Sequence, residues 1–208
     1  MVYNGHQERK MKKAVILCII FAVAASFAFA APFGIEFGWF LQDLDANGIR
    51  YYDYSDEHFV ALIPPFEYWL LSYYFADYNQ DGIYCVSAAT NDLTASPDGD
   101  VLWSNYNQII KDFYAFYGIP NMILDYYATP ELKKPSNFMI GLANDSIKIS
   151  TIWFVDEYAI SLNIMGYDEK TGAISCEITK YKDSISHFND LKTNFGAFFP
   201  ATKDDIPW

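Results

Sequence analysis

The stretch ISTIWFVDEYAISLNIMGYDEKTGAISCEITKY, residues 149–181, decides the fold class of this 208-residue chain. The runs 149–155, 159–165 and 173–181 are rich in the β-branched and aromatic residues that strands favour. Two polar breaks, 156–157 and 168–172, carry the turn-forming residues Asp and Gly. We therefore predict an antiparallel meander of three strands.

A long helix is predicted ahead of this meander. Between Leu102 and Tyr117 the apolar residues recur at spacings of three and four, which is the period of an amphipathic helix, and Gly118 and Pro120 follow its end. Further expected elements are a helix at 40–46, strands at 49–54, 59–63, 68–76 and 83–89, an irregular segment at 121–136 and a last helix at 184–195.

Each half of the chain thus runs from a helix into antiparallel strands. This order predicts an α+β fold in which helices pack on one face of a mostly antiparallel sheet, after an N-terminal signal helix. The two halves are expected to be similar in element order. A polar loop lies between them, so the domain 31–208 either subdivides near 91–101 or forms one unit, as its length favours.

Residues 11–30 are typical of a secretory signal peptide. Met11-Lys12-Lys13 supplies the positive charge, 14–30 is an apolar run, and Ala28-Phe29-Ala30 is a small-x-small cleavage site. We predict cleavage after Ala30 and a secreted or periplasmic domain, with residues 1–10 an extension and Met11 a more natural start than Met1. The alternative is a membrane anchor formed by residues 14–31.

The chain is acidic, with a net charge of −12. Loss of residues 1–30 would remove four cations and one anion and leave −15. This charge argues against nucleic acid and anionic membrane surfaces as partners, so contact with a membrane is expected only through an uncleaved signal segment.

Asp77, Asn79 and Asp81, followed by Gly82, are the calcium candidates, because oxygen-bearing residues at alternating positions open an EF-hand-like loop. The second half of the motif fails, since Ala88 stands where a bidentate acid is needed. Residues 43–48 repeat the same half-motif and fail in the same way. Turn chemistry explains both stretches without an ion.

Cys85 and Cys176 are the two cysteines that remain after signal removal. Both lie in predicted strands. In an oxidising compartment they form either a disulfide or two separate buried thiols, and the sequence leaves both alternatives open.

Adjacent aromatic residues are the positive indication of a binding surface. In a strand, one residue of each adjacent pair points away from the core unless both faces of the sheet are covered, which is the alternative interpretation. The candidate face comprises Tyr52, Tyr54, Tyr68, Trp69, Tyr73 and Tyr74.

The sequence carries none of the common catalytic or cofactor-binding motifs. Gly-x-Ser-x-Gly, Ser-x-x-Lys, Gly-x-Gly-x-x-Gly, the P-loop and His-Glu-x-x-His are absent beyond residue 30. We therefore expect neither an enzyme nor a cofactor.

Residues 34–39, Gly-Ile-Glu-Phe-Gly-Trp, with 41–44, and Phe116-Tyr117-Gly118-Ile119-Pro120 resemble phrases of small bacterial envelope modules. These are of the outer-membrane-assembly lipoprotein and β-lactamase-inhibitor-protein type. The resemblance implies short helices on an antiparallel sheet and a role in protein binding without catalysis or cofactors. The chain departs from the assembly lipoproteins in lacking their lipidated cysteine.

These observations favour an exported, non-enzymatic bacterial envelope protein that binds a protein partner. A glycan-binding module is the first alternative, because Tyr and Trp rings beside carboxylates and amides also suit sugars. An envelope hydrolase is the second.

Overall fold

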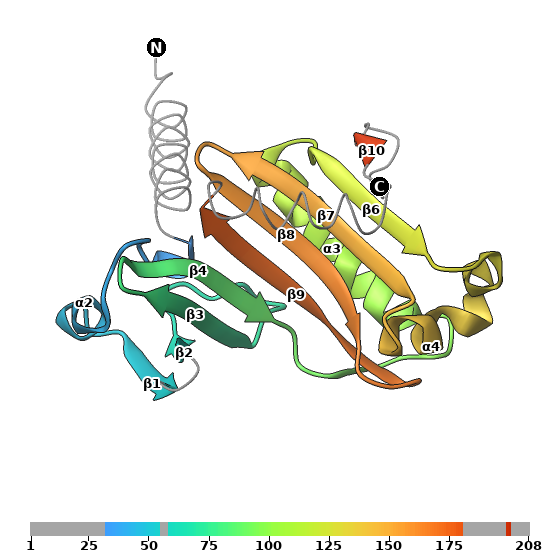
Figure 1. Cartoon of the computed structure of the whole chain (residues 1–208), viewed down its shortest axis with the longest axis horizontal. Helices are drawn as coiled ribbons and strands as arrows, with labels where there is room; N and C mark the ends of the chain where they lie inside the picture. The colour runs from blue at the N-terminus through green and yellow to red at the C-terminus, as the bar shows by residue number, and fades with distance from the viewer. Residues whose placement is uncertain (1–31, 55–57, 181–198, 201–208) are drawn as a thin grey trace, which may run out of the picture.

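The computed structural model describes residues 32–54, 58–180 and 199–200 and confirms an α+β fold with a mostly antiparallel sheet (Figure 1). Ten strands form one sheet in the order β1-β2-β3-β4-β9-β8-β7-β6-β10, and β5 also pairs with β9. The strands are β1 Arg50–Tyr54, β2 Phe59–Ile63, β3 Tyr73–Asn79, β4 Gly82–Ala89, β5 Leu93–Thr94, β6 Met122–Tyr127, β7 Ile147–Val155, β8 Tyr158–Gly166, β9 Thr171–Lys180 and β10 Phe199–Pro200. The expected signal segment and the helix expected at 184–195 lie outside the described residues.

The helices are short except for one. They are the 3₁₀ turns η1 Pro32–Gly34, η3 Pro130–Lys133 and η4 Pro135–Asn137 and the α-helices α2 Leu41–Ala46, α3 Asp100–Tyr117 and α4 Phe138–Ala143. Among the described residues, no helix combines the length and apolar character needed to cross a bilayer.

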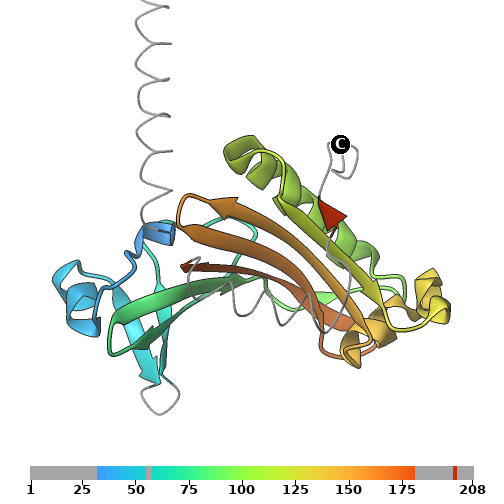
Figure 2. The same ribbon diagram turned by 45° about the horizontal axis from the view of Figure 1, so that its top comes forward.

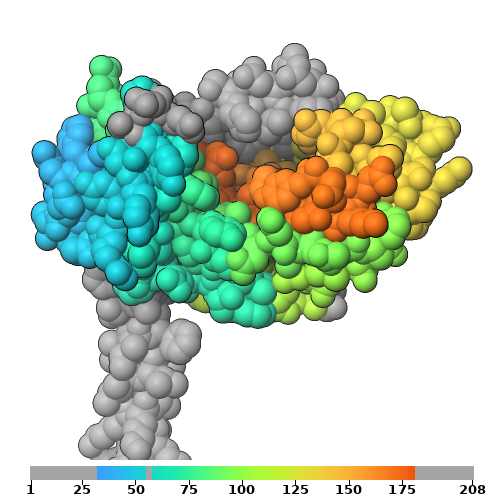
Figure 3. Space-filling model, turned by 90° about the horizontal axis from the view of Figure 1, so that it is seen from below, coloured from blue at the N-terminus to red at the C-terminus, as the bar shows by residue number. Residues whose placement is uncertain are grey.

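The sheet is continuous across the polar loop that separates the two halves of the chain. Strand β9 pairs with β8 on one side and with β4 on the other, over Ser175–Thr179. Figures 1 and 2 show β1 to β4 at one end of the molecule and β6 to β8 at the other, and Figure 3 shows the same division in a space-filling view. Strand β9 therefore joins the two halves.

Helices α3 and α4 pack on the same face of the sheet, here called the helix face. Tyr106 of α3 shares a hydrogen bond of 2.7 Å with the Thr151 hydroxyl, and the Phe113 ring lies 5.7 Å from that of Trp153. A Cβ built on Gly141 of α4 would lie 2.4 Å from Ile147. Residues 147, 151 and 153 lie on one face of β7 because side chains alternate along a strand.

The helix face continues into the first half of the chain. The register places Cys176 of β9 beside Ala88, Ala88 beside Tyr74, and Tyr74 beside Leu62. All four side chains are buried in one core cluster, which also contains Leu44 of α2. A single core thus runs under both halves, and each fully buried Leu or Ile contributes about 1.5–3 kcal/mol to it.

A register shift between β3 and β4 keeps this core intact at the hairpin end. Asp77 pairs with Cys85 and Tyr78 pairs with Ile83, so the register passes over Tyr84. The extra residue is a β-bulge, and it lets both Ile83 and Val86 point into the core.

The structure corrects two of the predicted elements. Strand β3 begins at Tyr73 and not at residue 68, because 68–71 form a turn in which the Leu71 N–H donates to the Tyr68 carbonyl at 2.9 Å. The segment expected to be irregular at 121–136 contains β6, whose six residues all pair with β7. Pro120 and Pro130, which flank this strand, concealed it in the sequence.

Gly82 fixes the contact between the β3–β4 hairpin and the N-terminal segment. Its φ is +94°, and a Cβ there would lie 2.4 Å from the carbonyl oxygen of Gly38. On either side of this approach, Gly38 donates to Ile83 at 2.7 Å and Ile83 donates to Trp39 at 2.8 Å.

We expect Gly82→Ala to lower the free energy of unfolding by on the order of 2–4 kcal/mol, because left-handed strain and a backbone clash add together. Gly48→Ala is the matched control, since its φ is +68° but no atom of the described residues lies within 4 Å of the added Cβ. It should cost about 1 kcal/mol. Urea unfolding of both variants measures the difference, and equal losses would contradict the clash.

Candidate binding surface

The face of the sheet opposite the helices carries a group of aromatic and apolar side chains on β1, β2 and β3. The register aligns Tyr52 with Ala61 and Ala61 with Phe75, and it aligns Tyr54 with Phe59. The alternate residues of β2 and β3, among them Val60, Leu62, Tyr74 and Ala76, lie in the core. We call this group the aromatic face, and it consists of Tyr52, Tyr54, Phe59, Ile63, Tyr73 and Phe75.

The three tyrosines of the aromatic face are exposed, and the rings of Tyr54, Phe59 and Phe75 pack on one another. The exposed fractions are 69% for Tyr52, 50% for Tyr54 and 51% for Tyr73. Tyr54 stacks on Phe59 with centroids 4.8 Å apart, and Phe59 meets Phe75 edge to face at 6.0 Å. Rings that already contact one another lose little conformational freedom on binding, and contiguous exposed apolar surface is typical of interaction sites.

Three of the six predicted face residues, Tyr52, Tyr54 and Tyr73, lie together on the aromatic face. Tyr74 does not, and this corrects the prediction: its side chain is only 4% exposed because the strand period turns it into the core. There its hydroxyl accepts the Tyr68 N–H at 2.8 Å and donates to the Leu71 carbonyl at 3.2 Å.

Tyr68 and Trp69 are also separate from the aromatic face, because both contact α3. The Tyr68 hydroxyl and the Trp69 indole N–H, at 3.3 Å, donate to the same carboxylate oxygen of Asp112, and Gln108 donates to the other oxygen at 2.9 Å. Burial and the neighbouring carboxylate raise the pKa of Tyr68 above its ordinary value. The two residues therefore tether the segment between β2 and β3 to the long helix.

The calcium candidates form a tight hairpin. Asn79 pairs with Gly82 across a two-residue turn, and the Asn79 side-chain oxygen accepts the Asp81 N–H at 2.7 Å. Asp77 is half-buried on the face opposite the helices, where desolvation raises its pKa. Across the described ranges, no three His, Cys, Asp or Glu side chains come together as a metal site.

Cys85 and Cys176 are unbridged in the structure, which corresponds to the second of the two alternatives, two separate buried thiols. Cys176 pairs with Ala88, whereas Cys85 pairs with Thr179, so the two thiols point to opposite faces of the sheet. Both are buried, and burial raises the pKa of Cys176 to about 12 and that of Cys85 as well.

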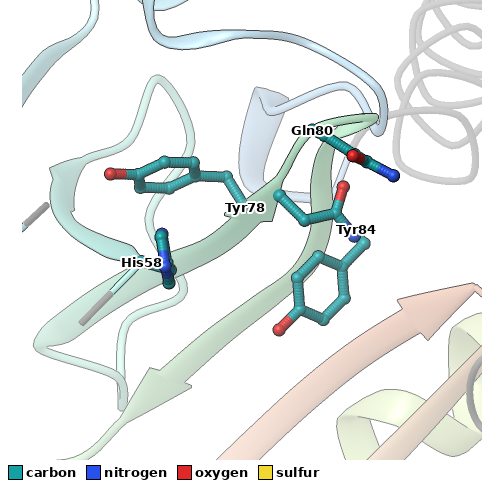
Figure 4. Close-up of a pocket in the computed structure, with 5 residues that line it drawn as sticks. His58, Tyr78, Gln80 and Tyr84 are labelled. Carbon is teal, nitrogen blue, oxygen red and sulfur yellow. The ribbon is translucent and has the colours of Figure 1, made fainter. Parts of the chain in front are cut away.

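A pocket of about 650 Å³ lies at the β3–β4 hairpin end (Figure 4). The His58 and Tyr78 rings meet edge to face at 6.1 Å, and Figure 4 shows Gln80 at the hairpin turn and Tyr84 on β4. The pocket is lined by His58, Tyr78, Asn79, Gln80 and Tyr84. Sequence reasoning missed it, because the bulge at Tyr84 and the position of His58 depend on strand pairing.

A second hollow, of about 300 Å³, lies between the start of α3 and the η3–η4 segment. Trp103, Tyr127 and Phe138 line it, and the Lys133 ammonium lies 5.7 Å from the Tyr127 ring centroid. Nothing in the sequence indicated that residues from these separate segments would meet.

Because both thiols are buried and protonated, we expect them to react slowly with a thiol reagent in the folded protein. In a Cys18→Ser variant, two thiols should become reactive when the protein is unfolded without reductant. Titration with Ellman's reagent before and after addition of denaturant measures this. If no thiol reacts after unfolding, and the mass of the protein is two hydrogens lower than that of the fully reduced chain, a disulfide has formed.

Comparison with known proteins assigns the chain to no family. No protein-family model matches the chain, and no curated protein sequence matches it significantly. The candidate function therefore rests on the surfaces described above.

Proposed function

We propose that residues 31–208 form an exported, non-enzymatic module of a bacterial cell envelope that binds a protein partner through the aromatic face. The observation that carries this proposal is the pair of exposed rings of Tyr52 and Tyr54 on one face of β1, with Tyr54 stacked on the half-buried ring of Phe59. Tyr is among the residues that supply most binding energy at protein interfaces, since it buries a large area at low entropic cost.

Export is proposed from the sequence of residues 11–30, with cleavage after Ala30. The acidic composition supports a soluble body outside the cytoplasm that does not adhere to anionic surfaces. The similarity of the two halves in element order, and the likeness to small envelope modules, belong to the same proposal. They favour a binding scaffold over a catalytic one.

The experiment compares two matched variants in affinity capture from an envelope extract. The double variant Tyr52→Ser, Tyr54→Ser removes two exposed rings of the aromatic face. The control Tyr167→Ser removes, from the β8–β9 turn, a tyrosine that is 53% exposed. Loss of two interface anchors should weaken partner capture by about tenfold or more. The control should capture as the wild type does, and both should keep the thermal unfolding midpoint.

Equal capture by the double variant and the wild type would contradict the aromatic face as the binding site. Solvent-accessibility labelling is an independent measurement. Slow labelling of Tyr52 and Tyr54 in the free protein would show that the face is not exposed.

A glycan-binding module is the second candidate, and the pocket at the hairpin end favours it. Its Tyr rings could stack on a sugar, and the amides of Asn79 and Gln80 with the His58 imidazole could hydrogen-bond to hydroxyls. An envelope hydrolase remains the third candidate and would need a carboxylate beside His58 in that pocket.

A glycan array separates the first two candidates. Protein binding through the aromatic face predicts no signal on the array. Glycan binding in the pocket predicts a signal that Gln80→Ala reduces. The Tyr52→Ser, Tyr54→Ser variant should leave that signal unchanged, because the pocket and the aromatic face are made of different residues.

A further inference from the structure

Strand β1 is an open edge of the sheet. It is the outermost strand at its end of the order and pairs with β2 alone, through all five of its residues. In an antiparallel pair every second residue directs its N–H and C=O away from the partner strand. Within the described residues, no backbone group of Arg50–Tyr54 bonds to anything outside this ladder.

The outermost strand at the other end differs in a way that limits pairing. Strand β10 has two residues and ends in Pro200, which lacks an N–H. Strand β1 is longer, contains neither Pro nor Lys, and pairs with β2 without a register shift. Its charged residues are Arg50 and Asp53, so of the features with which proteins usually block an edge it lacks the lysine, the proline and the bulge.

The two faces of β1 differ in chemistry. Tyr52 and Tyr54 are the exposed residues of the aromatic face. On the helix face, two hydroxyls hold two carboxylates at the edge: Tyr51 donates to Asp45 at 3.2 Å, and Tyr78 donates to Asp53 at 3.1 Å. A strand that pairs with β1 would therefore meet the two tyrosine rings and, at the start of the strand, Arg50 on one side, and carboxylates on the other.

We propose that β1 accepts an extended segment of a partner protein as an additional antiparallel strand, with apolar residues alternating with basic ones. Backbone hydrogen bonds would supply the pairing, and the alternation would supply specificity. The apolar residues would lie over Tyr52 and Tyr54, and the basic residues would face Asp45 and Asp53. The net charge of −12 also steers a basic segment towards the protein.

A second copy of the chain is a poorer occupant of this edge. Two copies would bring together two net charges of −12, and the carboxylates of Asp45 and Asp53 from each copy would gather along one seam. Like charges placed side by side oppose association.

This inference deepens the proposed function and rests on it. The test uses the full chain and a synthetic peptide of alternating Lys and Val, with amide hydrogen exchange of residues 50–54 as the measurement. We expect the peptide to slow exchange there. A peptide of alternating Glu and Val should do so at about tenfold higher concentration, because the carboxylates repel it.

Two controls separate strand pairing from general charge attraction. A Lys-Val peptide that is N-methylated at alternate residues, so that its pairing edge lacks N–H groups, should give no protection. Asp53→Lys should weaken protection by the unmodified peptide about tenfold, and Glu169→Lys, an equal charge change in the exposed β8–β9 turn, should leave it unchanged.

Three results would overturn the proposal: no protection of residues 50–54 by the Lys-Val peptide, equal protection by the N-methylated peptide, or protection that rises with protein concentration when no peptide is present. The last result would identify a second copy as the occupant. If capture of the partner still depended on Tyr52 and Tyr54, the proposed function would stand while the strand-addition inference fell.

Discussion

The pairing of β9 with β8 and β4 is the constraint on which the rest of the structure depends. Nine residue pairs join β9 to β8, and five join it to β4. Because a slip of one residue would turn every side chain to the other face, this register decides which residues α3 and α4 cover. Cys176 and Ile174 enter the core on that account.

The same register reaches the far edge of the sheet. Alternation carried through β4, β3 and β2 leaves Val60 and Leu62 in the core and turns Tyr52, Tyr54 and Phe75 to the opposite face. The β-bulge at Tyr84 interrupts the pairing of β3 with β4, and it keeps Ile83 buried at the hairpin end. The proposed binding surface is therefore a consequence of the core packing.

The edge of β1 and the aromatic face form one continuous feature. A partner strand beside β1 would extend the sheet and would also contact the exposed tyrosines, so backbone pairing and ring contacts would act together. The carboxylates of Asp45 and Asp53 add a charge preference on the other face. This combination explains how an acidic protein with exposed rings could select a partner.

The sequence by itself determined the local features: the strands of the meander, the apolar stripe of α3 and the acidic charge. These depend on neighbouring residues, through strand and helix periodicity. It also indicated three of the aromatic-face residues, but it misplaced Tyr74, since a period of two says which residues share a face and not which face is covered. It missed β6, because the prolines near this segment indicate an irregular chain. The pairing of β6 with β7, which makes it a strand, cannot be recognised from the sequence alone.

Only the tertiary structure decided the rest. The separation of Cys85 from Cys176, the contact between Tyr68 and Asp112, and the pocket around His58 all join residues that are distant in sequence. Such contacts follow from strand order and register, which are set by the burial of the whole core. No local pattern encodes them, because each strand run could pair with several others until the helices cover one face.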